Sequence, residues 1–224
     1  EEIPEGLIKP FDVNKDLYYT LDIEDGRVRE IQINPEEPGI QNLSLNIYII
    51  ERELLISQIS AAFVRGYVYF ERDILAPQLD KLNVHGYKFG GYIARISSIK
   101  SYFDENMKLL DEENLDALFG GNHIYTKIRD DNPTRYIKGA KAKNIMAADG
   151  CIIEGEVENS VLFRGVRVGK GAKVKNCVLM QDTVIEPGVN VEYIISDKNV
   201  TITADKEIKG TDSFPVYVAK YQVV

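Results

Sequence analysis

The stretch SVLFRGVRVGKGAKVKNCVLMQDTVIEPGVNV, residues 160–191, decides the fold that the sequence predicts. Apolar or small side chains recur in it every six residues, at Val166, Ala172, Val178 and Val184. Neither an α-helix nor a simple strand alternation has this period, whereas a parallel β-helix does, because each flat face takes about one hexapeptide. A run of short antiparallel strands is the alternative, but hairpins seldom keep one spacing over so many strands. We therefore expect a β-helix of roughly three coils.

The composition is that of an ordinary soluble globular protein. The chain has 224 residues, of which 44% are hydrophobic and 28% charged. Its net charge of -8 argues against nucleic acid or an anionic membrane as the main partner, because phosphate groups attract a basic surface. No apolar run is long enough to span a bilayer, and no signal peptide is evident. Cys151 and Cys177 have apolar neighbours and are expected to be buried thiols, which suits a cytoplasmic setting.

The part before the repeats shows alternating strand and helix patterns, which favour an incomplete α/β unit. Five elements are expected: a hairpin around residues 24–26, a buried strand at 43–50, a helix at 51–63, strands at 87–96 and a helix at 98–111. A further short helix is expected over residues 71–82, with Pro77 at a kink or at its end. The composition then changes near Asp130, where a basic segment reads as a linker into the repeats.

Five blocks of this sequence carry a resemblance to a known enzyme family. They are DGRVREIQINPEEP (25–38), SLNIYII (44–50), GGYIARISSIKSYFDENMKLLD (90–111), IYTKIRDDNPTRYI (124–137) and residues 150–188. In this order and spacing they resemble ADP-glucose pyrophosphorylase, or glucose-1-phosphate adenylyltransferase, over nearly the whole chain. The resemblance implies three segments: the C-terminal part of a nucleotidyltransferase-like α/β domain (1–130), a linker (131–144), and a left-handed parallel β-helix with a closing C-terminal strand (145–224).

Catalytic members of that family join a sugar-1-phosphate to the α-phosphate of ATP and release pyrophosphate, using basic side chains and a carboxylate-held Mg²⁺. Their Gly-rich phosphate loop has no counterpart in this sequence. Where they carry the sugar-phosphate lysine, this chain has Asn34, and where they carry the metal-binding aspartate it has Arg95. Of the polar contacts of their sugar-binding strand, only Ser44 remains. The resemblance thus implies remnants of a sugar-phosphate site at Asn34, Ser44 and Arg95, with no catalytic residue and no metal ligand.

These departures imply a non-catalytic, regulatory type of subunit for ADP-glucose synthesis in bacterial glycogen biosynthesis. Such a chain is expected to assemble through its β-helix, as a homo- or hetero-oligomer, with a catalytic subunit that alone requires Mg²⁺. Two alternatives stay open: a fragment of a catalytic enzyme that lacks its N-terminal catalytic loop, and a pure assembly module. Because the chain opens EEIPEG without Met, we expect a segment before it.

Histidine and lysine positions suggest two further hypotheses. Some hexapeptide proteins are acyltransferases with a histidine beside the coil, but the two histidines, His85 and His123, both precede the repeats, so this function is disfavoured.

A basic cluster of Arg135, Lys138, Lys141 and Lys143 could border a site for a phosphorylated effector. More basic residues follow in the coil: Arg164, Arg167, Lys170, Lys173 and Lys175. Pairing with Glu154, Glu156 and Glu158 on a solvated surface is the alternative.

Overall fold

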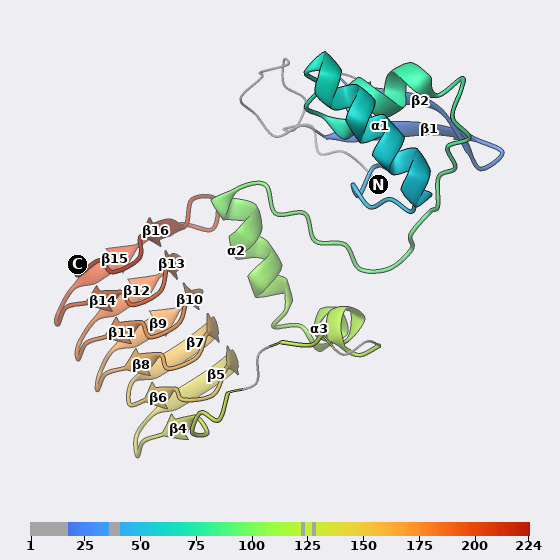
Figure 1. Cartoon of the computed structure of the whole chain (residues 1–224). Helices are drawn as coiled ribbons and strands as arrows, with labels where there is room; N and C mark the ends of the chain where they lie inside the picture. Colours follow the sequence, from blue (N-terminus) through green and yellow to red (C-terminus); the bar gives the residue numbers. More distant parts are fainter. Residues whose placement is uncertain (1–17, 36–40, 122–123, 127–128) are drawn as a thin grey trace. The chain divides into compact units, whose positions relative to one another are not determined.

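A computed structural model describes residues 18–35, 41–121, 124–126 and 129–224 (Figure 1). The chain divides into two compact units, Glu1–Gly90 and Gly91–Val224, and each is described by itself. Within the described ranges, no helix has the length and apolar character needed to cross a membrane.

The first unit contains a small antiparallel sheet and one long helix. Strands β1 (Tyr19–Glu24) and β2 (Arg27–Ile33) form the predicted hairpin, and the short β3 (Asn42–Leu43) pairs with the other edge of β1. Helix α1 (Arg52–Arg65) follows and ends at Gly66, whose left-handed backbone conformation (φ 70°) suits glycine. This hairpin and this helix confirm two of the predicted elements.

Three predictions for the part before the repeats differ from this structure. The strands predicted at 87–96 are absent, since residues 86–97 form neither a helix nor a strand. Instead of the short helix predicted over 71–82, a π-helical segment (Phe70–Leu75) continues into a 3₁₀ turn (Ala76–Gln78) that contains Pro77. The buried strand predicted at 43–50 is reduced to the end of β3, and Ile49 is fully exposed. Residues 44–50 are rich in apolar side chains, but no described strand lies beside them to accept and donate the ladder hydrogen bonds that a strand requires.

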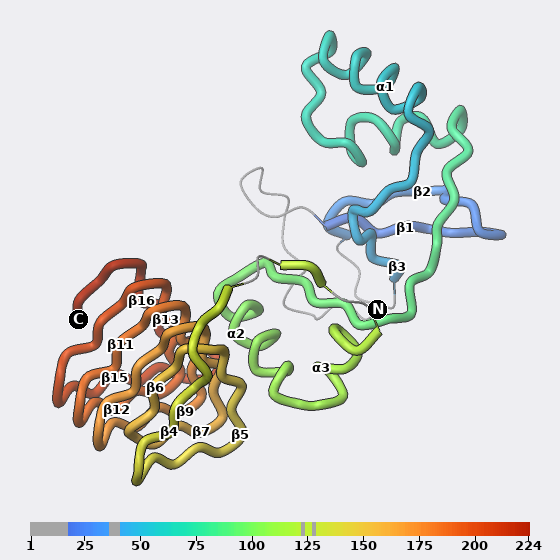
Figure 2. The backbone as a smooth tube through the Cα atoms, turned by 60° about the horizontal axis from the view of Figure 1, so that its bottom comes forward, coloured from blue at the N-terminus to red at the C-terminus, as the bar shows by residue number. Residues whose placement is uncertain are grey.

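The second unit is built on the β-helix, which confirms the predicted fold class (Figures 1 and 2). One face is a sheet of five parallel strands in the order β14-β11-β8-β6-β4, so the chain makes about four turns rather than three. Those strands are β4 (Arg135–Tyr136), β6 (Ile152–Ile153), β8 (Arg167–Val168), β11 (Val184–Ile185) and β14 (Thr201–Ile202). The other two faces carry β5 (Lys141–Ala147), β7 (Glu156–Leu162), β9 (Lys173–Lys175), β10 (Val178–Leu179), β12 (Asn190–Glu192), β13 (Ile194–Ser196), β15 (Glu207–Lys209) and β16 (Val216–Val218).

The coil begins before residue 145. Within residues 131–144, which the sequence suggested as a linker, β4 pairs in parallel with β6, and the first half of β5 pairs with β7. The segment lacks the apolar six-residue series because Tyr136 and Ala142, which pair with the inward-facing Ile153 and Val157, remain exposed in this first coil.

In-register stacking places identical positions of successive coils above one another. Ile153, Val168, Ile185 and Ile202 form one such inward column, and each is at most 1% exposed. Both cysteines are buried and free, as predicted. Burial raises the pKa of the Cys177 thiol to about 12, so this side chain behaves as a small apolar group of the core.

A typical coil spans 17 residues rather than 18, as the pairing of Val184 with Thr201 shows. The missing residue is lost at one corner, where a single residue with positive φ turns the chain between two faces. Three asparagines occupy that corner in successive coils, Asn144, Asn159 and Asn176, at φ of 48°, 47° and 50°. Asparagine is the non-glycine residue that tolerates this region best, which explains the choice of residue.

The corner asparagines form a ladder along the coil axis. The Asn144 side-chain amide donates to Asn159 Oδ1 at 2.7 Å, and the Asn159 amide donates to Asn176 Oδ1 at 2.6 Å. We expect Asn159→Ala to lower the free energy of unfolding by about 2 kcal/mol. Alanine is strained in the left-handed backbone conformation of this corner, and the variant loses two amide hydrogen bonds. Asn144→Ala, at the end of the ladder, loses one such bond and serves as the matched control. Equal losses in urea unfolding would contradict a role for the ladder.

Helix α2 (Ile99–Lys108) packs against the β-helix, which is why the second unit begins at Gly91. Its N-cap Ser98 and Ser101 form a reciprocal capping box, and the helix lies within the range 98–111 that the sequence predicted. Phe103 is 2% exposed and packs against Val178 and Ile195, whose side chains lie on the outer surface of the coil. A second helix, α3 (Glu112–Phe119), follows after the Asp111 N-cap.

Candidate functional site

Asn34 and Ser44 flank the start of β1. The Tyr18 N–H donates to Asn34 Oδ1 at 2.9 Å, and the Asn34 N–H donates back to the Tyr18 carbonyl at 3.0 Å. On the other side, the Ser44 N–H donates to the Tyr19 carbonyl at 2.8 Å. The two residues therefore lie at the same end of the sheet, one strand on either side of β1. Their visible roles are structural, since Asn34 supplies a turn with φ 45° and Ser44 continues the ladder.

The π-helical segment beside this sheet carries charged residues that the sequence reasoning missed. Burial raises the pKa of Glu71, and the Tyr48 hydroxyl donates to its carboxylate. Arg72 pairs with Asp73 at 2.6 Å and stacks over the Tyr69 ring at 4.2 Å. The pKa of Asp73 is lowered by Arg72 and by the N–H groups of residues 68 and 69. The charge of Arg72 is thus already neutralised by Asp73. The one feature of the sequence that could have indicated this cluster is the charged tripeptide Glu71-Arg72-Asp73.

Arg95 belongs to the second unit and lies in an extended segment before α2 that forms no helix or strand. In catalytic members the corresponding aspartate would bind Mg²⁺. A guanidinium carries the wrong charge for this task and has no lone pair to offer a metal. Across the residues that the structure describes, no group of three or more His, Cys, Asp and Glu side chains could hold a metal ion. The donor set therefore does not fit Mg²⁺.

The predicted effector residues lie on two faces of the first coil. Arg135 is in β4, Lys138 is in the turn that follows, and Lys141 and Lys143 are in β5 on the next face. Lys141 Nζ lies 2.7 Å from Glu156, and Lys143 Nζ lies 2.8 Å from Glu158. Two of the four basic groups thus have the carboxylate partners that the alternative interpretation expected. The four do not line one cavity, and an effector role for them stays a prediction.

These two ion pairs predict a pH effect on stability. Lys141 holds the pKa of Glu156 below its ordinary value of 4.5, chiefly by a hydrogen bond, and Lys143 does the same for Glu158. A carboxyl group with a lowered folded-state pKa stabilises the fold above its unfolded pKa, and this contribution disappears as the pH falls through the folded value. We expect Glu156→Gln/Glu158→Gln to show a smaller fall in melting temperature between about pH 6 and about pH 3.

The matched control for this pH effect is Glu112→Gln/Glu113→Gln on α3. Neither of these residues takes part in an ion pair within the described part of the chain. Equal pH dependence in the wild type and both double variants would mean that the lysine pairs contribute nothing.

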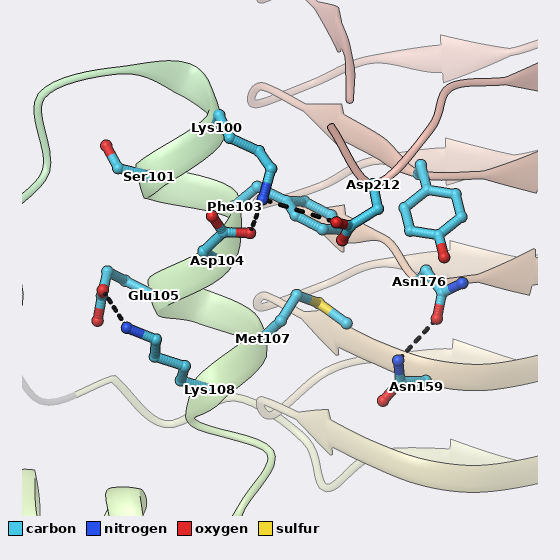
Figure 3. Close-up of a pocket in the computed structure, with 11 residues that line it drawn as sticks. Lys100, Ser101, Phe103, Asp104, Glu105, Met107, Lys108, Asn159, Asn176 and Asp212 are labelled. Atoms are coloured by element: carbon cyan, nitrogen blue, oxygen red, sulfur yellow. Dashed lines mark hydrogen bonds and ion pairs between the residues drawn. The ribbon is translucent and has the colours of Figure 1, made fainter. Parts of the chain in front are cut away.

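A shallow cavity of about 500 Å³ lies between α2 and the asparagine corner (Figure 3). Its charged groups satisfy one another. Lys108 pairs with Glu105 at 2.8 Å, and Lys100 lies between Asp104 and Asp212, the latter at 3.9 Å. Because each cation already faces a carboxylate, the cavity offers a ligand little uncompensated charge, and we interpret it as the seam where α2 packs on the coil.

Comparisons with known proteins agree with this architecture. The family model described as GlmU-like, C-terminal hexapeptide, matches residues 128–214. The glycogen biosynthesis protein GlgD of Bacillus subtilis is 37% identical over 195 residues, which cover 87% of this chain and 57% of that protein. A glucose-1-phosphate adenylyltransferase of Clostridioides difficile is 32% identical over 204 residues, covering 89% of this chain and 53% of that enzyme.

A second GlgD, from Geobacillus stearothermophilus, is 40% identical over 132 residues, covering 58% of this chain and 38% of that protein. The chain thus spans about half the length of the curated relatives it matches. The matches with the first two relatives cover 87% and 89% of this chain, so they include residues of both the segment before the repeats and the β-helix. The chain belongs to the ADP-glucose pyrophosphorylase family, which contains both the glucose-1-phosphate adenylyltransferases and the GlgD proteins.

Proposed function

We propose that this chain acts in bacterial glycogen biosynthesis as part of a non-catalytic, regulatory subunit of ADP-glucose pyrophosphorylase. The observation that carries the proposal is the pair of substitutions at Asn34 and Arg95. An asparagine cannot supply the positive charge that a sugar phosphate requires, and an arginine repels the metal ion that neutralises the triphosphate. The Asn34 side chain is also committed to the Tyr18 N–H, so it contributes to the turn rather than to a ligand.

The match with two GlgD proteins supports the same proposal, since both are named for glycogen biosynthesis and not for an enzyme activity. In this role the chain binds a catalytic subunit and changes its response to effectors. Mg²⁺ is needed by that catalytic partner alone. The basic residues Arg135, Lys138, Lys141 and Lys143 are the proposed contacts for a phosphorylated effector in the assembled enzyme.

Activity assays test this function directly. We expect no ADP-glucose from the chain alone with ATP, glucose-1-phosphate and Mg²⁺. Mixed with a catalytic glucose-1-phosphate adenylyltransferase, the chain should co-purify and shift the enzyme's kcat or KM. Turnover by the chain alone would overturn the proposal. Co-purification without any kinetic change would identify a pure assembly module instead.

The two substituted positions allow a second test. Asn34→Lys and Arg95→Asp, made together in the full-length protein without a partner, should produce turnover only if the rest of a catalytic site is present. Restored turnover would favour the fragment of a catalytic enzyme. Lys138→Ala and Lys141→Ala test the effector contacts, since a lost effector response with intact assembly supports them and an unchanged response in both discards them.

A further inference from the structure

The asparagine ladder ends at the cavity between α2 and the coil, and its last member keeps a free donor. Asn159 and Asn176 both line this cavity of about 500 Å³ (Figure 3). Asn176 Oδ1 accepts the Asn159 amide at 2.6 Å, whereas the side-chain N–H groups of Asn176 donate to no atom of the described residues. Asn176 is only 8% exposed. A buried amide that lacks an acceptor favours binding of a ligand oxygen, because that oxygen supplies the missing hydrogen bond.

The ladder ends there because the next coil has a tyrosine at the corner. Tyr193 follows Asn176 by one coil and has a φ of 52°. A bulky residue is unusual in this left-handed region, where another asparagine could have accepted the Asn176 amide. The Tyr193 ring lies 6.1 Å from the Phe103 ring between centroids and lines the same cavity. Its hydroxyl forms no hydrogen bond within the described part of the chain, so the cavity gains an aromatic wall and a second free polar group.

The rim of the cavity is charged but nearly balanced. Two ammonium groups face three carboxylates, which belong to Lys100, Lys108, Asp104, Glu105 and Asp212. The excess of one negative charge repels a phosphate or carboxylate ligand, and such a ligand would also have to break an existing ion pair. A hydroxyl group both donates and accepts hydrogen bonds, so it can join these pairs without adding an unbalanced charge. The rim therefore favours a neutral ligand that is rich in hydroxyl groups.

We propose that this cavity is a binding site for a neutral saccharide. A saccharide oxygen accepts the free Asn176 amide, neighbouring hydroxyls bond to Tyr193 and to the ion pairs of the rim, and the apolar face of the sugar ring lies against Tyr193 and Met107. An apolar wall with a few directed polar groups is typical of small-molecule sites, and the volume lies in their range of roughly 300–1,000 Å³. All lining residues belong to the second unit, and the site is independent of the regulatory role proposed above.

Titration of the ¹⁵N-labelled chain with maltose, and separately with glucose, tests the proposal by nuclear magnetic resonance. We expect the side-chain amide signals of Asn176 and the backbone signals of α2 to shift with at least one sugar. The side-chain signals of Asn199, an exposed corner asparagine with a φ of 58°, should stay in place. No shift at Asn176 with either sugar would overturn the proposal. Inorganic phosphate that shifts the same signals at lower concentration than the sugars would also overturn it, in favour of an anion site.

Variants separate ligand binding from packing. Asn176→Gly removes the free amide and keeps the corner, since glycine adopts the left-handed region readily. It should raise the sugar Kd, followed through the α2 signals, about fivefold. Asn199→Gly makes the same change outside the cavity and should leave the Kd unchanged. Tyr193→Phe should weaken binding without lowering the melting temperature, because the ring keeps its contact with Phe103. Wild-type affinity in both Asn176→Gly and Tyr193→Phe would reject the site and leave the tyrosine a packing role alone.

Discussion

Replacing Gly155 with alanine is expected to lower the free energy of unfolding by about 3 kcal/mol, near the upper end for an overpacked core. The corner of the next coil lies directly over this glycine. A Cβ atom at Gly155 would come within 2.4 Å of the Ala172 carbonyl oxygen and 2.7 Å of the Gly169 carbonyl oxygen. Both obstacles are main-chain atoms, so no rotamer change can relieve them. The Ala172 carbonyl also accepts the Glu156 N–H at 2.8 Å, a ladder bond that must lengthen.

Thermal unfolding measures this effect, with an expected fall in melting temperature of roughly 6–12 °C for a chain of this size. Gly121→Ala is the control within the same unit, because a Cβ there meets nothing within 4 Å. A Gly155→Ala variant that melts with the control would mean that the corner can shift outward without cost.

Gly155 also illustrates what the sequence could and could not predict about the coil. The six-residue apolar beat predicted the β-helix because each face of the coil repeats after about six residues, although of its members Val178 lies on the outer surface under α2 rather than in the interior. It did not predict that the second coil is two residues shorter than the coil on either side of it, which the pairings Arg135↔Ile152, Ile152↔Arg167 and Arg167↔Val184 show. That difference depends on how one corner folds over another, and such a contact leaves no periodic signal.

Where the coil begins could not be predicted, for a related reason. The first coil has a neighbouring coil on one side alone, so Tyr136 and Ala142 stay exposed at its inward positions, and the apolar series fades before the β-structure does. Composition therefore indicated a linker where parallel strands are present. Domain limits at 130 and 144 stay predictions about the family's architecture, whereas the compact units divide at Gly90 and Gly91.

The candidate site was predictable only in part. The substitutions at Asn34 and Arg95 can be read from sequence blocks, since a change of charge is visible at one position. The cluster of Tyr48, Glu71 and Asp73 depends on a π-helical segment that brings residues from separate segments together. The sequence has no periodic pattern that predicts a π-helical segment, because such a segment depends on packing against the sheet and α1.

Replacing Phe103 with alanine is expected to release α2 from the coil, the second large effect. Phe103 is 2% exposed and is the one residue of α2 that is fully buried. Removing a buried phenylalanine costs about 3–5 kcal/mol, and here the ring also loses its contact with Tyr193, 6.1 Å away between centroids. The remaining links of α2 to the coil include the exposed Lys100–Asp212 pair, which contributes little.

Amide hydrogen exchange distinguishes helix release from a general loss of stability. We expect the α2 amides to lose protection in Phe103→Ala while β8 and β11 keep theirs, because the inward columns of the coil do not depend on α2. Ile99→Ala is the control on the same helix, since Ile99 is 49% exposed. Phe103→Leu should retain most of the protection, because it keeps an apolar group over Val178 and Ile195. Unchanged α2 protection in Phe103→Ala would show that the ion pairs and the capping box hold the helix without its aromatic anchor.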